Sequence, residues 1–262
     1  MIEHNFKKKF GQNFIKDISV VNKIISKADV PDNTLVIEIG PGAGSLTSKL
    51  VNVAKYVIAY EIDLELEDYL DELERDHSNL KIIWDDFLKR DIKEDIKLYS
   101  YNHLYVIANL PYYITTPIIT KFIDDNIEID SMIIMVQKEV AQRLLASPNN
   151  KDYGSLTVFL NYHFNIEKMF DVSRNVFIPK PNVDSTIIKL SSKKDKLKVT
   201  NISCFYKLVR DSFRFKRKNL KNNLNNYDLE KIEKVLIKYN KNLTVRAESL
   251  SLEVFVDISN NL

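Results

Sequence analysis

Short apolar runs rich in Val and Ile alternate along the first two thirds of the chain with stretches in which apolar residues recur every three or four positions. Such runs are typical of buried strands, and the longer spacing is typical of amphipathic helices. Their alternation predicts an α/β fold with a doubly wound, Rossmann-like sheet. The predicted strands are 34–39, 57–60, 80–84, 104–108, 130–136 and 185–190; the predicted helices begin near 18, 45, 117 and 137; and 156–160 fits either.

The pattern changes after residue 190. Residues 191–200 are polar and rich in lysine, which is typical of a linker. From residue 201 on, apolar residues again recur at helical spacing. We therefore expect two domains, one at 1–190 and a small, all-helical one at 201–262.

Composition narrows the class of protein. With 45% hydrophobic and 28% charged residues, the 262-residue chain is ordinary for a globular protein. Cys204 is the only cysteine and the four histidines are scattered, so we expect neither an internal disulfide nor a metal site. No stretch approaches the roughly 18 apolar residues of a membrane span, and residues 1–16 lack the apolar region of a signal peptide. We expect a cytoplasmic protein with no membrane partner.

Charge is separated along the chain, although its net value is only +2. Residues 61–76 contain nine acids and one arginine, whereas 189–221 contain twelve Lys and Arg and two Asp. Such separation indicates a surface for a polyanion, although lysine runs are often plain solvated surface. The run around Phe215 mixes an aromatic ring with cations, as RNA-binding surfaces do. Its candidate RNA-binding residues are Arg214, Lys216, Arg217, Lys218 and Lys221.

The first residues of the chain also mix cations with aromatic rings. Lys7, Lys8 and Lys9 lie within a stretch, 6–14, that contains three phenylalanines. A flexible basic arm would not normally carry so many rings. We therefore expect a segment that folds over a ligand, with its lysines available to RNA; a strap packed on the core is the alternative.

A glycine turn joins the first predicted strand to a helix. Three of the chain's five glycines, Gly40, Gly42 and Gly44, fall in this turn, where they let the backbone approach a ligand and let helix pack on strand. The spacing is neither the GxGxxG of dinucleotide sites nor a P-loop with GK[ST]. Glu38, just before the turn, disfavours a polyphosphate and favours a cation. S-adenosylmethionine fits, because it carries a sulfonium and an ammonium.

Acidic residues follow the second and third predicted strands. Glu61 lies about 20 residues after the glycines, where such sheets bind ribose hydroxyls. Asp85 or Asp86 can accept a hydrogen bond from an exocyclic amine of the ligand, with Phe87 against its ring. An N-cap aspartate is the alternative interpretation.

The fourth predicted strand is followed by Asn109-Leu110-Pro111-Tyr112. Pro111 fixes its own φ and favours an extended Leu110, which aims the Asn109 amide oxygen and the Leu110 carbonyl into one small space. Tyr112 adds a rigid aromatic face. Two acceptors and a ring suit a ligand that is an aromatic amine. The alternative interpretation is purely structural: a turn that ends the strand, with Tyr112 in the core. In the helix that follows, Thr116 and Pro117 suit the N-cap and the first helical position.

These motifs resemble those of the KsgA-type ribosomal RNA adenine dimethyltransferases. The resemblance implies a class I S-adenosylmethionine-dependent methyltransferase sheet, and N6,N6-dimethylation of adenosines in small-subunit (16S) ribosomal RNA. It also implies a role in ribosome biogenesis on immature 30S subunits, and we expect a monomer. The matching stretches span nearly the whole chain: 9–14, 38–44, 109–112 with 116–118, 137–141, 153–154, 177–181 and 246–248.

The resemblance also implies roles for single residues. Asn13 and Ile15 would close over the cofactor, and Gly40 would contact its methionine part. Asn109 would serve both the cofactor and the target amine. The expected cofactor-binding set is Asn13, Ile15, Glu38, Gly40, Gly42, Gly44, Glu61, Ile62, Asp86, Phe87 and Asn109. The expected catalytic set is Asn109, Leu110, Pro111, Tyr112 and Phe177, with the two aromatic rings stacked on the target base.

Three positions depart from the family pattern. Tyr113 and Thr115 stand where asparagine and serine are usual, which bears on the shape of the base pocket. Lys180 stands where the small-subunit group usually has proline, and it is similar here to the Erm-type enzymes that methylate 23S ribosomal RNA. An Erm-type enzyme and a non-catalytic nucleic-acid-binding relative are the alternatives. The basic helical segment disfavours a small-molecule methyltransferase.

Overall fold

A sheet of seven strands, in the order β4-β3-β2-β5-β6-β9-β7, organises the first part of the protein. The computed structural model describes residues 14–111 and 113–262. Strands β2 to β6 pair in parallel, and β9 runs antiparallel to β6. The bounds are β2 (Thr34–Ile39), β3 (Tyr56–Glu61), β4 (Leu80–Trp84), β5 (His103–Asn109), β6 (Ser131–Gln137), β7 (Phe164–Val172) and β9 (Ser185–Ser192).

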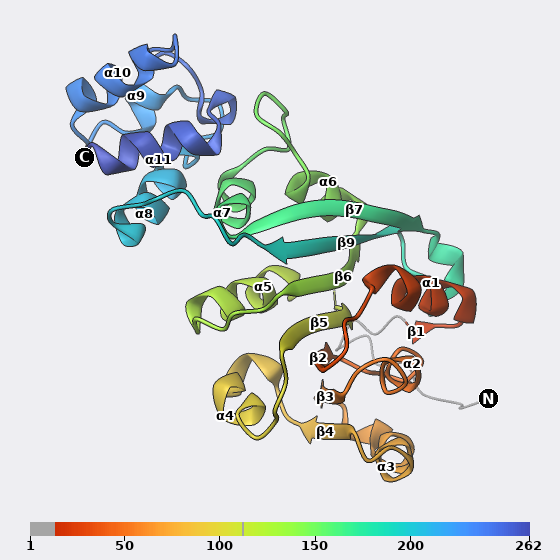
Figure 1. Ribbon diagram of the computed structural model, residues 1–262. Coiled ribbons are helices and arrows are strands. Elements are labelled where there is room, and N and C mark those ends of the chain that lie inside the picture. Colours follow the sequence, from red (N-terminus) through yellow and green to blue (C-terminus); the bar gives the residue numbers. More distant parts are fainter. Residues whose placement is uncertain (1–13, 112) are drawn as a thin grey trace. The chain divides into compact units, whose positions relative to one another are not determined.

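Helices cover both faces of this sheet, as Figure 1 shows. Helices α1 (Ile18–Ala28), α2 (Thr47–Leu50) and α3 (Glu67–Asp76) lie on one face, and α4 (Ile92–Ile96) and α5 (Thr115–Asp124) lie on the other. The strands are buried on both faces, which explains their nearly continuous apolar sequence. The predicted α/β, doubly wound sheet is therefore confirmed.

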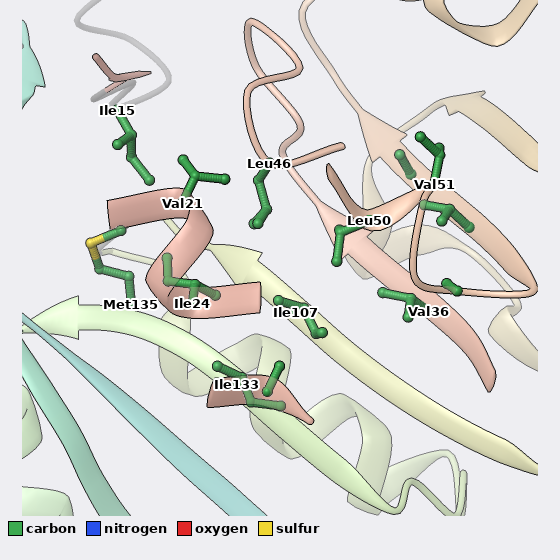
Figure 2. Close-up of a cluster of buried hydrophobic side chains, with 14 of the residues drawn as sticks. Ile15, Val21, Ile24, Val36, Leu46, Leu50, Val51, Ile107, Ile133 and Met135 are labelled. Atoms are coloured by element: carbon green, nitrogen blue, oxygen red, sulfur yellow. The ribbon is translucent and has the colours of Figure 1, made fainter. Parts of the chain in front are cut away.

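A hydrophobic core forms between the sheet and the first three helices (Figure 2). Val21 and Ile24 of α1 and Leu50 of α2 pack against alternate residues of the strands, such as Val36 and Ile107. The alternation follows from the two-residue period of a strand, which sends neighbouring side chains to opposite faces. This packing fixes where the strands end, and so where the residues after them lie.

The order of the strands creates a switch point between β2 and β5. From β2 the chain continues outward through β3 to β4, and then returns to the other side of β2 as β5. Loops that follow neighbouring strands on either side of such a point diverge, and ligands bind in the crevice between them. The turn after β2 and the turn after β5 therefore flank the expected ligand site.

The chain divides into two compact units, 1–141 with 167–192 and 142–166 with 193–262. This division differs from the predicted domains in two segments: 142–166 groups with the C-terminal helices, and the predicted linker 191–200 is divided between the units after residue 192. Apolar residues of 142–166, such as Val158, share a core with Phe205 and Phe255. The second unit contains α7 (Ser155–His163), α8 (Ile202–Ser212), α9 (Leu220–Asn223), α10 (Leu229–Lys238) and α11 (Leu252–Asn260).

Some predicted elements need correction or were not foreseen. Helix α5 begins at Thr115 with Ile114 as its N-cap, so the predicted cap at Thr116 is wrong. The ambiguous segment 156–160 lies in helix α7. Strand β7 was not predicted, and neither was the two-stranded sheet of β1 (Phe14–Ile15) and β8 (Phe177–Ile178). No helix in the described residues has the length and apolar character that crossing a membrane requires.

Candidate functional site

A cavity of about 220 Å³ lies at the carboxyl ends of strands β2, β3, β4 and β5. The structure thus brings together residues from segments far apart in the sequence. Gly44 and Phe177 are not among the residues that line it. The predicted residues Lys7, Lys8, Lys9, Asn13 and Tyr112 lie outside the described residues. The predicted residues that do line it are Ile15, Glu38, Gly40, Gly42, Glu61, Ile62, Asp86, Phe87, Asn109, Leu110 and Pro111.

The glycine turn after β2 forms one wall of the cavity. Gly42 has a φ of 55°, and a Cβ atom placed on it would lie 2.7 Å from the ring of Phe14. The absence of a side chain at Gly42 therefore allows Phe14 to lie against the turn. Gly44 does not line the cavity, and a Cβ there would meet Tyr69 and Leu73 of helix α3. Its lack of a side chain therefore allows close helix packing, and its contact with a cofactor stays a prediction.

Glu61 ties the end of β3 to the glycine turn. One of its carboxylate oxygens, Oε2, accepts a hydrogen bond from the Gly42 N–H at 3.1 Å. The other, Oε1, accepts from Ile62 and Asp63 at 2.8 and 2.9 Å. Burial raises the pKa of Glu61, and these three N–H donors oppose the rise. The carboxylate is therefore held at a fixed position on the cavity wall.

Glu38 is the most deeply buried acid of the site, with 1% of its surface exposed. Burial raises its pKa from 4.5 to about 8, and the Glu61 carboxylate adds to the rise. Its Oε2 atom has no hydrogen-bond partner among the described residues. A buried carboxyl oxygen without a partner is costly unless the group stays protonated or meets a cation. The Glu38 carboxyl group therefore suits a ligand that carries a positive charge.

The turn after β4 contributes a second acid. Asp86 Oδ1 accepts the Leu88 N–H at 3.0 Å, which caps a single turn of 3-10 helix, Phe87–Lys89. Its Oδ2 lies 3.5 Å from the exposed Lys89 ammonium. Asp86 therefore caps a helical turn, as the alternative interpretation predicted. It also lines the cavity, where the predicted hydrogen bond to a ligand amine would form. Phe87, only 4% exposed, packs edge-on against Tyr60 at 5.1 Å.

The turn after β5 forms the opposite wall. Asn109 is the last residue of the strand, and Leu110 is buried with 2% exposed. The Pro111 carbonyl accepts the Ile114 N–H at 3.2 Å, which closes the turn. Tyr113 lines the cavity and is 63% exposed. Sequence reasoning noted Tyr113 only as a departure from a family pattern, although its place two residues after Pro111 was a usable signal.

Phe177 does not line the cavity. It is 1% exposed, pairs with Ile15 of β1 from its position in β8, and belongs to the core between the sheet and helices α1 to α3. This placement does not support the prediction that its ring stacks on a target base. Other cavity-lining residues, Phe14 and Tyr60, were missed by sequence reasoning. Phe14 was visible only as part of an aromatic stretch, and Tyr60 only as the residue before Glu61.

Four of the predicted RNA-binding residues of the second unit lie in the loop after α8, residues 213–219, which we call the basic loop; the fifth, Lys221, lies in helix α9. Arg214, Phe215 and the three cations that follow are exposed. Asn223, which is buried, holds the loop: its amide donates to the carbonyls of Ser212, Phe215 and Lys218, and its oxygen accepts the Phe215 N–H at 3.1 Å. The loop therefore has a defined backbone beneath exposed charged side chains, of which Lys216 donates to the Lys151 carbonyl and Arg214 lies over the Phe215 ring.

Comparison with known sequences gives a consistent result. The sequence profile of the family described as "Ribosomal RNA adenine dimethylase" matches residues 3–262. A protein of Onion yellows phytoplasma (strain OY-M) named "Ribosomal RNA small subunit methyltransferase A" is 46% identical over 97% of this chain and 95% of its own length. A protein of the same name from Geobacillus sp. (strain WCH70) is 43% identical over 98% of this chain and 92% of its own length.

Solved structures show the same fold. A dimethyladenosine transferase from Plasmodium falciparum superposes with a TM-score of 0.79 at 28% identity, covering 94% of this chain and 95% of that one. The 23S rRNA methyltransferase ErmE superposes with a TM-score of 0.75 at 25% identity, covering 95% of this chain and 99% of that one. The predicted class I methyltransferase fold is confirmed by these two similarities.

Proposed function

The chain belongs to the ribosomal RNA adenine dimethylase family and is an rRNA adenine dimethyltransferase, and we propose that it modifies the small-subunit (16S) rRNA of immature 30S subunits in the cytoplasm. The relatives that match it at 43–46% identity are named for the small subunit. ErmE, which is named for the 23S rRNA, is only 25% identical. The difference in identity favours the small-subunit substrate.

We propose S-adenosylmethionine as the cofactor, because the acidic and aromatic side chains that line the cavity fit it. Glu38 Oε2 is a buried carboxyl oxygen without a partner among the described residues, and an ammonium could donate a hydrogen bond to it, while a nearby sulfonium would favour its negative charge. Glu61 is held where ribose hydroxyls bind in such sheets. Asp86 Oδ2 and the Phe87 ring lie after β4, where an adenine amine and ring can be bound. When bound, this compound supplies a methyl group on a positively charged sulfur.

Asn109 and Leu110 would act on the target adenine. The lone pair of its N6 nitrogen is delocalised into the ring, which makes it a poor nucleophile. Hydrogen bonds from N6 to the Asn109 side-chain oxygen and the Leu110 carbonyl localise the lone pair and stabilise the positive charge that develops as the methyl group arrives. The proton can leave afterwards to water, so no strong base is required.

The remaining acceleration would come from positioning. The target base must leave its helix or loop and enter the cavity, and an aromatic face next to the opening lowers the cost of extruding it. Tyr112 is the predicted stacking residue, and Tyr113 is the described aromatic residue with the most exposed surface at the cavity. Holding N6 in line with the sulfur then converts a bimolecular step into a unimolecular one.

The observation that carries the proposal is the convergence of Glu38, Glu61, Asp86 and Asn109 on one cavity. The test is incubation of the protein with tritiated S-adenosylmethionine and either immature 30S or 50S subunits that lack the relevant methyl groups. We expect label in 16S rRNA, on N6 of adenosine, in amounts approaching two methyl groups per modified base. Label in 23S rRNA instead would assign an Erm-type activity, and binding of 30S subunits without label would assign a non-catalytic role.

A further inference from the structure

The turn that carries Asp86 follows β4, a strand at the edge of the sheet. Among residues 14–111 and 113–262, strand β4 is the outermost strand of the sheet and pairs with β3 alone, so no described strand on its other side restrains the turn that follows. Asp85 to Leu88 nevertheless supply four consecutive lining residues of the cavity. An acid that recognises a ligand through one hydrogen bond must be held in place by its surroundings. Contacts outside the sheet must therefore fix this turn.

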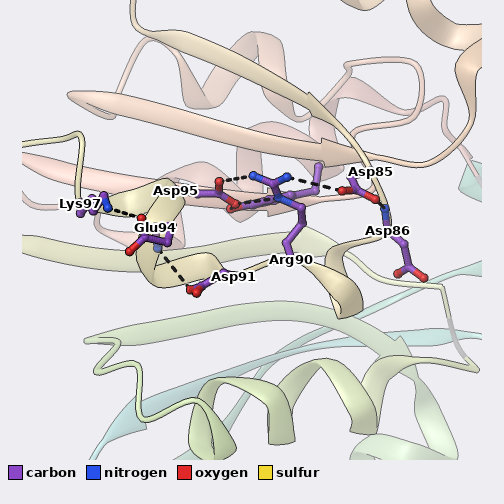
Figure 3. Close-up of polar contacts among 8 residues, drawn as sticks. Asp85, Asp86, Arg90, Asp91, Glu94, Asp95 and Lys97 are labelled. Atoms are coloured by element: carbon purple, nitrogen blue, oxygen red, sulfur yellow. Dashed lines mark hydrogen bonds and ion pairs between the residues drawn. The ribbon is translucent and has the colours of Figure 1, made fainter.

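Arg90 makes these contacts, as Figure 3 shows. Its Nε donates to Asp95 Oδ2 at 3.2 Å, and its Nη2 donates to Asp95 Oδ1. Its Nη1 faces Asp85 Oδ2 at 3.5 Å. The other oxygen of Asp85, Oδ1, accepts the Asp86 N–H at 2.7 Å. The rigid fork of the guanidinium thus connects helix α4 to the backbone of Asp86 through a single intermediate side chain.

The acid at the other end of this connection is itself fixed. Asp95 is 9% exposed, and its Oδ2 accepts the hydroxyl of Tyr60 at 3.0 Å. Tyr60 is the strand residue before Glu61, and its ring packs on Phe87. The contacts run in order through Asp85, Arg90, Asp95, Tyr60 and Phe87. The backbone of the turn, from Asp85 to Phe87, closes them into a ring that we call the Arg90 circuit. Every member of this circuit either lines the cavity or holds a residue that does.

We propose that Arg90 is a positioning residue that orients the Asp86 carboxylate and thereby makes the cavity selective for a purine bearing a 6-amino group. This inference rests on the proposed cofactor role of the cavity. Asp86 Oδ1 accepts the Leu88 N–H, so Oδ2 is the oxygen that would meet a ligand amine; it lies 3.5 Å from the exposed Lys89 ammonium, and its direction depends on the conformation of the turn. Arg90 sets that conformation through Asp85. Ion pairs at partly exposed sites contribute little to the free energy of unfolding, so we assign the Arg90–Asp85 pair a positioning role rather than a stabilising one.

The test compares binding of S-adenosylhomocysteine with binding of its analogue in which hydrogen replaces the 6-amino group, by titration calorimetry. The hydrogen bond to a charged acceptor predicts that the wild-type protein prefers the amine by about tenfold or more. We expect Arg90→Gln to reduce the preference to about threefold or less, with affinity for the deamino analogue nearly unchanged. We also expect kcat at saturating S-adenosylmethionine to stay within about twofold of wild type.

Two further variants separate positioning from stability. Arg90→Gln leaves Asp95 nearly buried without its counter-charge, which destabilises the fold; the double variant Arg90→Gln/Asp95→Asn removes both charges and should show the same loss of preference. Lys97→Gln removes one positive charge from the nearby exposed pair with Glu94 and should keep the wild-type preference. The acids of both pairs, Asp95 and Glu94, lie on helix α4 (Figure 3).

The outcomes are distinct. A wild-type preference that persists in both Arg90 variants would overturn the positioning role, even if their melting temperatures fall. Equal binding of the two compounds to the wild-type protein would also overturn it, because no amine would then be recognised. Failure of the wild-type protein to bind S-adenosylhomocysteine at all would instead refute the proposed function of the cavity.

Discussion

The cavity of the first unit and the basic loop of the second unit are built on opposite principles. In the cavity, the charged groups are buried carboxylates held by backbone N–H donors, as at Glu61. In the basic loop, the charged groups are exposed cations, and one buried amide, that of Asn223, holds the backbone beneath them. The first arrangement holds a carboxylate in one direction through several hydrogen bonds, and the second concentrates positive charge at the surface.

The contrast follows from the two ligands that we propose. Methyl transfer needs the reacting atoms aligned, so the groups around them must be rigid and shielded from water. Attraction to the phosphates of RNA acts over a longer range, needs no fixed direction and is screened by salt. The two regions should therefore respond differently to mutation, pH and ionic strength.

The largest expected effect is at the turn after β5. Asn109→Ala removes one of the two proposed acceptors for the target amine and should lower the single-turnover methylation rate about 100-fold. Affinity for S-adenosylhomocysteine should fall much less. Asn52→Ala, which removes a side-chain hydrogen bond to the Ser48 carbonyl at a position that does not line the cavity, serves as the control. A single-turnover rate equal to that of the wild type would remove Asn109 from the chemistry.

The next effect concerns the pH dependence of cofactor binding. Glu38 has its pKa raised to about 8 by burial, so it is protonated in the free protein at neutral pH. A bound cation favours the charged carboxylate, so binding should release a proton, and affinity should rise with pH by up to about tenfold per unit below about pH 8 and level off above it. Calorimetry in buffers of different ionisation enthalpy measures the released proton directly.

Glu38→Gln provides the matched variant for this prediction. The amide cannot ionise, so both the proton release and the rise in affinity with pH should disappear. The same pH dependence in wild type and variant would show that another group is responsible.

The smallest effect is expected in the basic loop. Replacing Lys216, Arg217 and Lys218 together with Gln should make the dependence of log affinity for immature 30S subunits on log salt shallower by about two, because about three phosphate contacts are lost. Affinity for S-adenosylhomocysteine should not change. The control is the equivalent triple replacement of exposed Lys231, Lys234 and Lys238 on α10. If both triple variants alter the slope equally, the basic loop has no special role in RNA binding.

Much of the cavity could be predicted from the sequence. Strands β2, β3 and β5 are buried on both faces, so their apolar runs are nearly continuous and their ends are sharp. Because parallel strands end at the same edge, residues that follow them meet there. That is why Glu38, Glu61, Asp86 and Asn109 could be grouped without a structure.

Other features depend on tertiary packing that local sequence does not record. Strand β7 mixes exposed and partly buried residues, so its sequence lacks a clean strand pattern. Segment 142–166 belongs with the C-terminal helices because of the core it shares with them, and no change of composition marks its boundary. The burial of Phe177 depends on its pairing with Ile15, 162 positions away in the chain. The Arg90 circuit joins three separate segments and has no sequence motif.

The most direct test of the account is a crystal structure of the protein with S-adenosylhomocysteine. We expect the adenine amine within hydrogen-bond distance of Asp86 Oδ2, the ribose hydroxyls on Glu61, and the ammonium at the Glu38 side of the glycine turn. The sulfur should face the Asn109 side chain and the Leu110 carbonyl. A ligand bound elsewhere, or bound in this cavity with its sulfur directed away from those two oxygens, would contradict the account.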